Sequence, residues 1–197
     1  MSDKPTRDTT AGTVYLDLRK LARHTGRPTD ELLQLYALEG FLSRVTMSRH
    51  RPNFVLKGGV LLAAYEVRRP TRDIDFAMRN IDGDLGGLLA LIKDVLSENV
   101  NDGISFDIEA TTIDTIRDEA VYPGARARIS GALATAKIRS HIDINIGDPL
   151  WPEPAIVEIP RLLGGQALPI LGYSIELVLA EKIVTGDCQL NGGSGLA

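Results

Sequence analysis

The chain has 197 residues, of which 44% are hydrophobic and 24% charged, and its formal net charge is −4. These values fit one compact globular domain, and they exclude a membrane-spanning helix because no apolar run approaches the roughly 20 residues that a span requires. The polar N-terminus lacks the apolar core of a secretory signal, and one cysteine (Cys188) with three scattered histidines argues against a disulfide or zinc site, so we expect a cytoplasmic protein.

The N-terminal part of the chain is predicted to be helical. Residues 1–12 are polar and are expected to form a flexible tail. Apolar residues then recur every three or four positions over 13–26 and 28–50, which predicts two helices, and Thr29 after a proline is typical of a helix start. The expected organisation is a single domain over 13–197, with a helical part at about 13–52, a core at about 53–186 and a frayed Gly/Ser-rich end at 187–197.

The rest of the chain mixes strands and helices. A short buried segment ends in a Gly-Gly turn, and helices are predicted at 60–67, 84–99 and from Ser174 onward. Strands are predicted by alternation or as short extended pieces, and three of them in succession favour an antiparallel meander. The predicted strands cover 72–79, 103–113, 125–133, 137–147, 155–160 and 166–172. This order predicts an α+β fold with a mixed or antiparallel sheet.

Asp73 and Asp75 are the first candidates for chemistry. On a strand, residues two apart share one face, so both carboxylates point the same way while Ile74 points into the core. A divalent cation such as Mg²⁺ relieves the repulsion between them and prefers one or two carboxylates plus substrate phosphates. The alternative is a charged patch on an exposed strand.

The glycines before this strand suggest a phosphate site. Gly58 and Gly59 allow a tight turn and close backbone approach to a ligand, and the predicted helix that follows offers free N–H groups. Lys57 adds a positive charge there. The alternative is an ordinary turn between a strand and a helix.

A third carboxylate is predicted on the strand at 137–147. Asp143 shares a face with His141 and Asn145, and it completes a set with Asp73 and Asp75 if the two strands are neighbours. Three carboxylates around two metal ions suit in-line phosphoryl transfer. Asp148 is an alternative third carboxylate, and the candidate cations for a triphosphate are Lys182, Lys137 and Arg72.

Because the net charge is negative, a nucleic-acid partner needs a local basic face. Basic residues alternate along the predicted strands, so several of them can share one face, although acidic neighbours leave an ordinary solvated surface as the alternative. The residues of this candidate face are Arg117, Arg126, Arg128, Lys137 and Arg139.

Four blocks, read in order, resemble a known family. "LKGGVLLAAY", "RRPTRDIDF", "IDINIGD" and "ELVLAEKI" look like the AbiEii/AbiGii-type nucleotidyltransferase toxins, including the MenT-like mycobacterial group. The likeness spans roughly Leu33 to Val184. It implies a polymerase-β-like nucleotidyltransferase core that uses Mg²⁺ and an NTP, with CTP favoured by analogy. It also implies a toxin that adds nucleotides to the tRNA 3′ end, with a cognate antitoxin as partner.

The resemblance also implies roles for individual residues. Asp73 and Asp75 would bind Mg²⁺, and Asp143 would be a third ligand or base. Thr71 stands at the Ser/Thr of its block, and phosphate there would repel the nucleotide, so it is a candidate regulatory site. The nucleotide would be held by Gly58, Gly59, Lys57, Arg69, Lys137 and Lys182.

One block of the family pattern is not seen. Members usually carry basic and acidic residues soon after the Glu-Lys helix, whereas this sequence continues as "VTGDCQLNGGSGLA". Either the site is less complete than in the family, or Lys137 and Arg139 compensate. Two rival functions also stay open, namely nucleotidylation of a protein or small-molecule hydroxyl, and a non-catalytic binding module.

Overall fold

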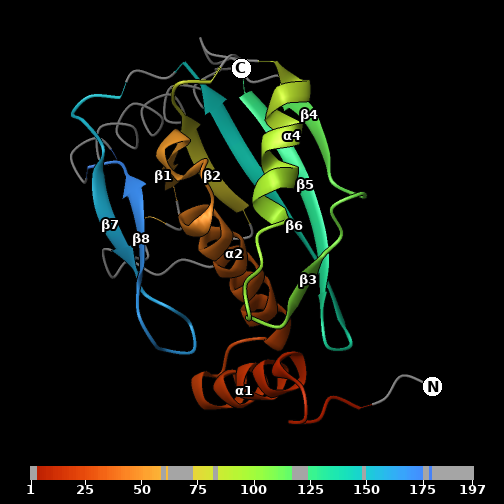
Figure 1. The fold of residues 1–197 in the computed structure, drawn as a ribbon. Helices are drawn as coiled ribbons and strands as arrows, with labels where there is room; N and C mark the ends of the chain where they lie inside the picture. Colours follow the sequence, from red (N-terminus) through yellow and green to blue (C-terminus); the bar gives the residue numbers. More distant parts are fainter. Residues whose placement is uncertain are drawn as a thin grey trace, which may run out of the picture.

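The computed structural model describes residues 4–58, 61, 73–81, 84–116, 124–147, 150–174 and 178. Eight strands of the described chain form one mixed sheet in the order β3-β5-β6-β2-β1-β8-β7, with β4 paired to β5 (Figure 1). The α+β fold with a mixed sheet and flanking helices is therefore confirmed. None of the described helices is both long and apolar enough to cross a bilayer.

The N-terminal helices are α1 (Thr10–Thr25) and α2 (Thr29–Met47). The expected tail over 1–12 is wrong at its boundary, because the Thr9 side chain accepts a hydrogen bond from Gly12 N at 3.0 Å and so caps α1 three residues earlier than the apolar spacing predicts. Helix α1 ends at Gly26 in the left-handed conformation. The predicted start of α2 at Thr29 is confirmed.

The central strands carry the site. A 3-10 turn (Arg51–Asn53) leads into β1 (Phe54–Lys57), and β2 (Asp73–Met78) pairs with it antiparallel. On its other side, β2 pairs in parallel with β6 (Ala136–Ile146). Strand β2 therefore lies inside the sheet with a partner on each side.

The meander is confirmed with one change. Strand β5 (Gly124–Leu133) forms an antiparallel hairpin with β6, but the segment predicted as one strand at 103–113 is two strands, β3 (Ile104–Phe106) and β4 (Thr112–Ile116). Both pair with β5. The break arises because Asp107 forms a local turn, accepting hydrogen bonds from Ala110 N at 3.1 Å and from the Thr111 hydroxyl at 3.1 Å.

The remaining elements are a helix that packs on the sheet and two strands that form its far edge. Helix α4 (Leu85–Leu96) starts at Asp84, whose carboxylate accepts a hydrogen bond from Gly87 N at 2.9 Å. Strands β7 (Ala155–Ile159) and β8 (Leu168–Gly172) form the far edge, as predicted, and β8 joins β1 in parallel. Val178 N donates to Ser174 O at 3.1 Å, as at a helix start, and the rest of that predicted helix lies outside the described residues.

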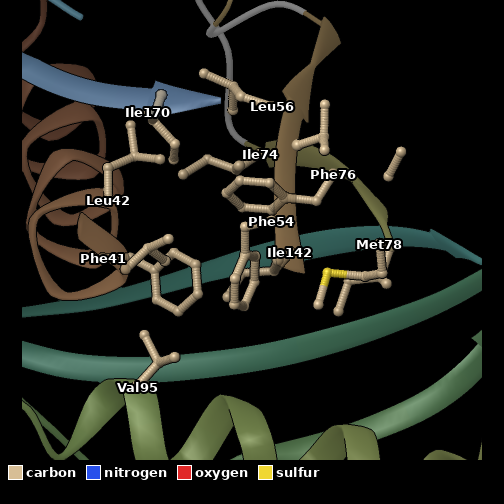
Figure 2. Close-up of a cluster of buried hydrophobic side chains, with 14 of the residues drawn as sticks. Phe41, Leu42, Phe54, Leu56, Ile74, Phe76, Met78, Val95, Ile142 and Ile170 are labelled. Atoms are coloured by element: carbon tan, nitrogen blue, oxygen red, sulfur yellow. The ribbon is translucent and has the colours of Figure 1, made fainter. Parts of the chain in front are cut away.

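Helices α2 and α4 cover one face of the sheet, and the main core lies between them and the strands (Figure 1). Phe41, Phe54 and Phe76 form its centre, packed edge to face with ring centroids 4.9–6.2 Å apart (Figure 2). A second cluster packs α1 against α2 and the β5–β6 hairpin, and it includes Leu18, Leu32, Leu133 and Ile138. The opposite face of β2 and β6 is left for polar side chains.

Candidate active site

Asp73 and Asp75 lie on the face of β2 that points away from the core. Ile74 and Phe76, which alternate with them, are completely buried, whereas both aspartates are half-buried. In the register with β6, Asp73 stands beside His141 and Asp75 beside Asp143. Because strands in parallel register place neighbouring residues on one face, the three aspartates share a surface, as the sequence predicts.

His141 supports the first aspartate. Its Nδ1 lies 3.3 Å from Asp73 Oδ1, at long hydrogen-bond distance, and both side chains are partly exposed. The sequence places His141 on the same face but assigns it no role. This contact restrains the orientation of the Asp73 carboxylate.

The turn after β1 comes directly against Asp75. Lys57 is the register partner of Asp75, and the next residue, Gly58, has φ +71. A Cβ added at Gly58 would lie 2.6 Å from Asp75 Cγ, which no real side chain allows. Glycine is therefore required here both for its conformation and for its contact with the carboxylate.

Arg126 engages the third aspartate. Its Nε donates to Asp143 Oδ1 at 2.7 Å and its second guanidinium nitrogen donates to Oδ2 at 2.6 Å, a bidentate pair. These bonds raise the pKa of Arg126 above its usual value, the charges on Asp143, Asp73 and Asp75 add to the rise, and partial burial opposes it. Arg126 therefore lies in the electric field of all three carboxylates.

Charged residues of the site that are register partners form one row that runs across five neighbouring strands. In register order it runs Lys57, Asp75, Asp143, Arg126 and Asp114. Arg128, one row along on β5, forms an ion pair with Asp114. Two of the cations predicted to contact RNA are thus paired with carboxylates, and these pairs depend on the register of β5 against β6 for Arg126 and against β4 for Arg128.

The donor set fits a magnesium ion on two carboxylates. Asp73 and Asp75 supply the hard oxygen ligands that Mg²⁺ prefers, and Gly58 lies directly against the Asp75 carboxyl group. No group of three or more His, Cys, Asp or Glu side chains that could hold a metal occurs among the described residues. The three-carboxylate set is therefore not assembled here, since Asp143 is held by Arg126.

Lys137 and Arg139 lie elsewhere on β6. They share the face of Asp143 but precede it by six and four residues, or roughly 20 and 13 Å at about 3.3 Å per residue. Lys137 is therefore not brought to the carboxylates that it was predicted to assist. The predicted residues Gly59, Arg69, Thr71, Arg72, Arg117, Asp148 and Lys182 lie outside the described residues.

A mixed sheet that carries paired aspartates beside a glycine is the arrangement that the resemblance to nucleotidyltransferases implies. The chain belongs to the family "Nucleotidyl transferase AbiEii toxin, Type IV TA system", whose model matches residues 40–186. No curated protein sequence matches it.

Two solved structures from Helicobacter pylori are similar to this chain. JHP933 is 16% identical with a TM-score of 0.50, and the match covers 78% of this chain and 56% of that one. A candidate nucleotidyltransferase is 17% identical with a TM-score of 0.48, over 77% and 57% of the two chains. The chain thus spans a little over half the length of the structures it resembles.

Proposed function

We propose that this protein is the toxin of a toxin–antitoxin pair and transfers nucleotides from an NTP, with CTP favoured, to the 3′ end of tRNA. An added nucleotide would block aminoacylation and hence translation. The observation that carries the proposal is the contact of Gly58 with Asp75, which joins a phosphate-compatible turn to a carboxylate pair. The tRNA end and the pyrimidine preference rest on the family resemblance.

In this proposal the chain's own residues bind and orient the reactants. Gly58 and Gly59 let the triphosphate approach the backbone, and Asp73 and Asp75 would hold Mg²⁺, which neutralises phosphate charge when bound. The hydroxyl oxygen of the terminal ribose forms a bond to the α-phosphorus while the bond to pyrophosphate breaks, and the hydroxyl proton passes to solvent. Arg69 and Lys182 are proposed to bind the phosphates, and Asp143 to act as the third carboxylate once Arg126 releases it.

Regulation and partners are part of the same proposal. Phosphorylation of Thr71, two residues before Asp73, would place negative charge beside the carboxylates and hinder nucleotide entry. A cognate antitoxin is the expected partner, in a cytoplasmic protein organised as one domain over 13–197. Full activity of a Thr71→Glu variant would contradict the regulatory part.

The transfer is tested with labelled NTPs, Mg²⁺ and total tRNA. We expect the wild type to label tRNA, and Asp73→Ala and Asp75→Asn each to lose at least about 100-fold of the rate, because each removes a ligand of the metal-bound triphosphate. The matched control is Asp114→Asn, a carboxylate of the same row that pairs with Arg128 at the edge strand, and it should keep its activity.

One observation favours a second acceptor. Arg126 and Arg128, half of the predicted RNA-binding set on these strands, are tied to Asp143 and Asp114. A smaller free basic surface suits nucleotidylation of a protein or small-molecule hydroxyl. Label that appears on protein and on no RNA would establish this alternative and exclude the tRNA proposal.

A further inference from the structure

A groove lies at the other end of β6 from the carboxylates. It has a volume of about 740 Å³ and is bounded by α1, α2 and the start of β6. Figure 1 shows α1 at the lower end of α2, the same end of the sheet as the β5–β6 turn. We call it the hairpin groove, and its polar lining consists of Tyr15, Arg19, Thr29, Asp30, Gln34, Thr135, Lys137 and Arg139.

The hairpin groove is positively charged in a chain of net negative charge. Arg19, Lys137 and Arg139 are exposed, and none of them forms an ion pair within the part of the chain that the structure describes. Asp30 is the one carboxylate of its lining. Within its own lining the groove therefore carries an excess of two positive charges, while Asp107 and Glu109 line the neighbouring cavity that Lys137 and Arg139 also border.

The walls of the groove are held together by specific contacts. Gln34 Nε2 donates to the backbone oxygen of Arg139 at 3.1 Å, which fixes β6 against α2. Arg19 lies over the Tyr15 ring at 6.0 Å, and Leu32, Leu33 and Ile138 are buried beneath in the second hydrophobic cluster. The three cations are therefore held on a rigid base at a fixed distance from the site.

The distance from the hairpin groove to the carboxylates can be compared with the length of a nucleic-acid strand. Lys137 and Asp143 point to the same face of β6, roughly 20 Å apart for six residues of strand. At the rise of about 3.4 Å per nucleotide of a strand in duplex DNA, the interval corresponds to roughly six nucleotides. A strand whose end lies at the carboxylates therefore reaches the hairpin groove.

We propose that the hairpin groove binds the phosphate backbone of an RNA acceptor about six nucleotides from its reacting end. This inference rests on the proposed function only in taking RNA as the acceptor. The guanidinium and ammonium groups neutralise phosphates without reading sequence. The groove therefore selects acceptors by length: a substrate too short to span from the carboxylates to α1 loses these contacts.

The test measures binding of the full-length protein to tRNA and to a trinucleotide, without NTP, over 50–200 mM NaCl. The variants are Arg19→Gln, Lys137→Gln and Arg139→Gln, and the matched control is Lys20→Gln, an exposed cation that neighbours Arg19 in α1 but does not line the groove. Thermal unfolding of each variant checks that it is folded.

We expect each groove variant to weaken tRNA binding several-fold and to reduce the slope of log K against log salt by about one, since one phosphate contact is lost. Lys20→Gln should match the wild type, and trinucleotide binding should be unchanged in every variant. Groove variants with wild-type affinity and slope for tRNA would overturn the inference while leaving the proposed function standing.

Two further outcomes also decide it. Loss of trinucleotide binding in the groove variants would overturn the inference by placing these cations at the reacting end. Loss of antitoxin binding with unchanged tRNA binding would overturn it by assigning the groove to a protein. A wild-type protein that binds no RNA at all refutes the RNA acceptor, and the proposed function fails together with the inference.

Discussion

At the scale of single residues, the contact between Gly58 and Asp75 restricts position 58 to glycine more strictly than any other contact in the site restricts a residue. Gly58 has φ +71 and Gly26 has φ +70, so alanine suffers the same backbone strain of about 1–2 kcal/mol at either position. A Cβ at Gly26 meets nothing within 4 Å, whereas at Gly58 it overlaps the Asp75 carboxyl group. Comparing the two positions separates strain from contact.

We predict that Gly58→Ala abolishes nucleotidyl transfer and that Gly26→Ala keeps it, although Gly26→Ala still loses about 1–2 kcal/mol of stability in urea denaturation. The measurements are the transfer rate and the free energy of unfolding of both variants. Equal activity of the two would mean that the closeness of Gly58 to Asp75 has no part in catalysis.

Arg126 invites a second prediction at this scale. Removing its charge leaves the field of the three aspartates unopposed, so Arg126→Gln should bind Mn²⁺ about 5–10-fold more tightly, on the order of 1 kcal/mol for a unit charge a few ångströms away. Arg128→Gln, two residues along the same strand and paired with Asp114, should bind Mn²⁺ as the wild type does. Calorimetric titration distinguishes them, and equal affinities in all three proteins would count against the role of Arg126.

At the scale of elements, a buried ion pair joins α2 to the segment that precedes β3. Arg44 donates to Asp102 at 2.6 and 3.3 Å and to the backbone oxygen of Gly40 at 2.9 Å, and it lies over the Phe106 ring at 4.7 Å. Both side chains of the pair are about 95% buried. Breaking such a pair leaves an uncompensated charge inside the protein.

We predict that Asp102→Asn lowers the free energy of unfolding by about 3–5 kcal/mol, because Arg44 stays buried without a counter-charge. Asp17→Asn removes the exposed pair with Arg7 at 2.7 Å and should leave the free energy of unfolding nearly unchanged, because solvent screens this pair. Urea denaturation of both variants gives the comparison. Similar losses in the two would show that the buried pair does not hold α2 to the sheet edge.

The elements also show what the sequence can and cannot predict. Alternation is enough to find β2, β5 and β6, because buried and more exposed residues alternate over 73–76, 124–130 and 137–145. It does not reveal the break between β3 and β4, where the Asp107 turn interrupts an otherwise continuous pattern. Local patterns also do not fix the strand order, because β1–β8 and β2–β6 join segments far apart in the chain.

The same reasoning applies to the site. The spacing of Asp73 and Asp75 predicts a shared face, and their neighbour Asp143 follows once β2 and β6 are assumed to be adjacent. The engagement of Asp143 by Arg126 was not predicted, because it requires the register of the hairpin rather than the composition of either strand. The hairpin groove likewise needs α1 to be placed against β6.

At the scale of the whole molecule, Glu39 makes stability depend on pH. Burial raises the pKa of Glu39, while the hydrogen bond from Leu162 N and the charge of Arg161 only partly oppose the rise. A carboxyl group whose folded pKa lies above its unfolded value stabilises the fold below the unfolded pKa. That contribution is lost as pH rises from about 4.5 through the folded pKa.

We therefore predict that the stability of the wild type relative to Glu39→Gln falls as pH rises above about 4.5 and then levels off, since glutamine keeps an acceptor for Leu162 N but has no charge to bury. Urea denaturation of both proteins between pH 4 and 8 gives the difference curve. A flat difference over that range would rule out Glu39 as its source.

The inner position of β2 limits how far the strand that carries Asp73 and Asp75 can move. Residues 75–78 of this strand have a partner strand on each side, and Ile74 and Phe76 anchor it in the aromatic centre of the molecule (Figure 2). The amide protons of residues 75–78 should exchange with solvent only when the entire domain unfolds. Asp73 and Asp75, the proposed metal ligands, thus lie on its least deformable part, and in the proposed function any closing motion around a nucleotide has to come from other segments.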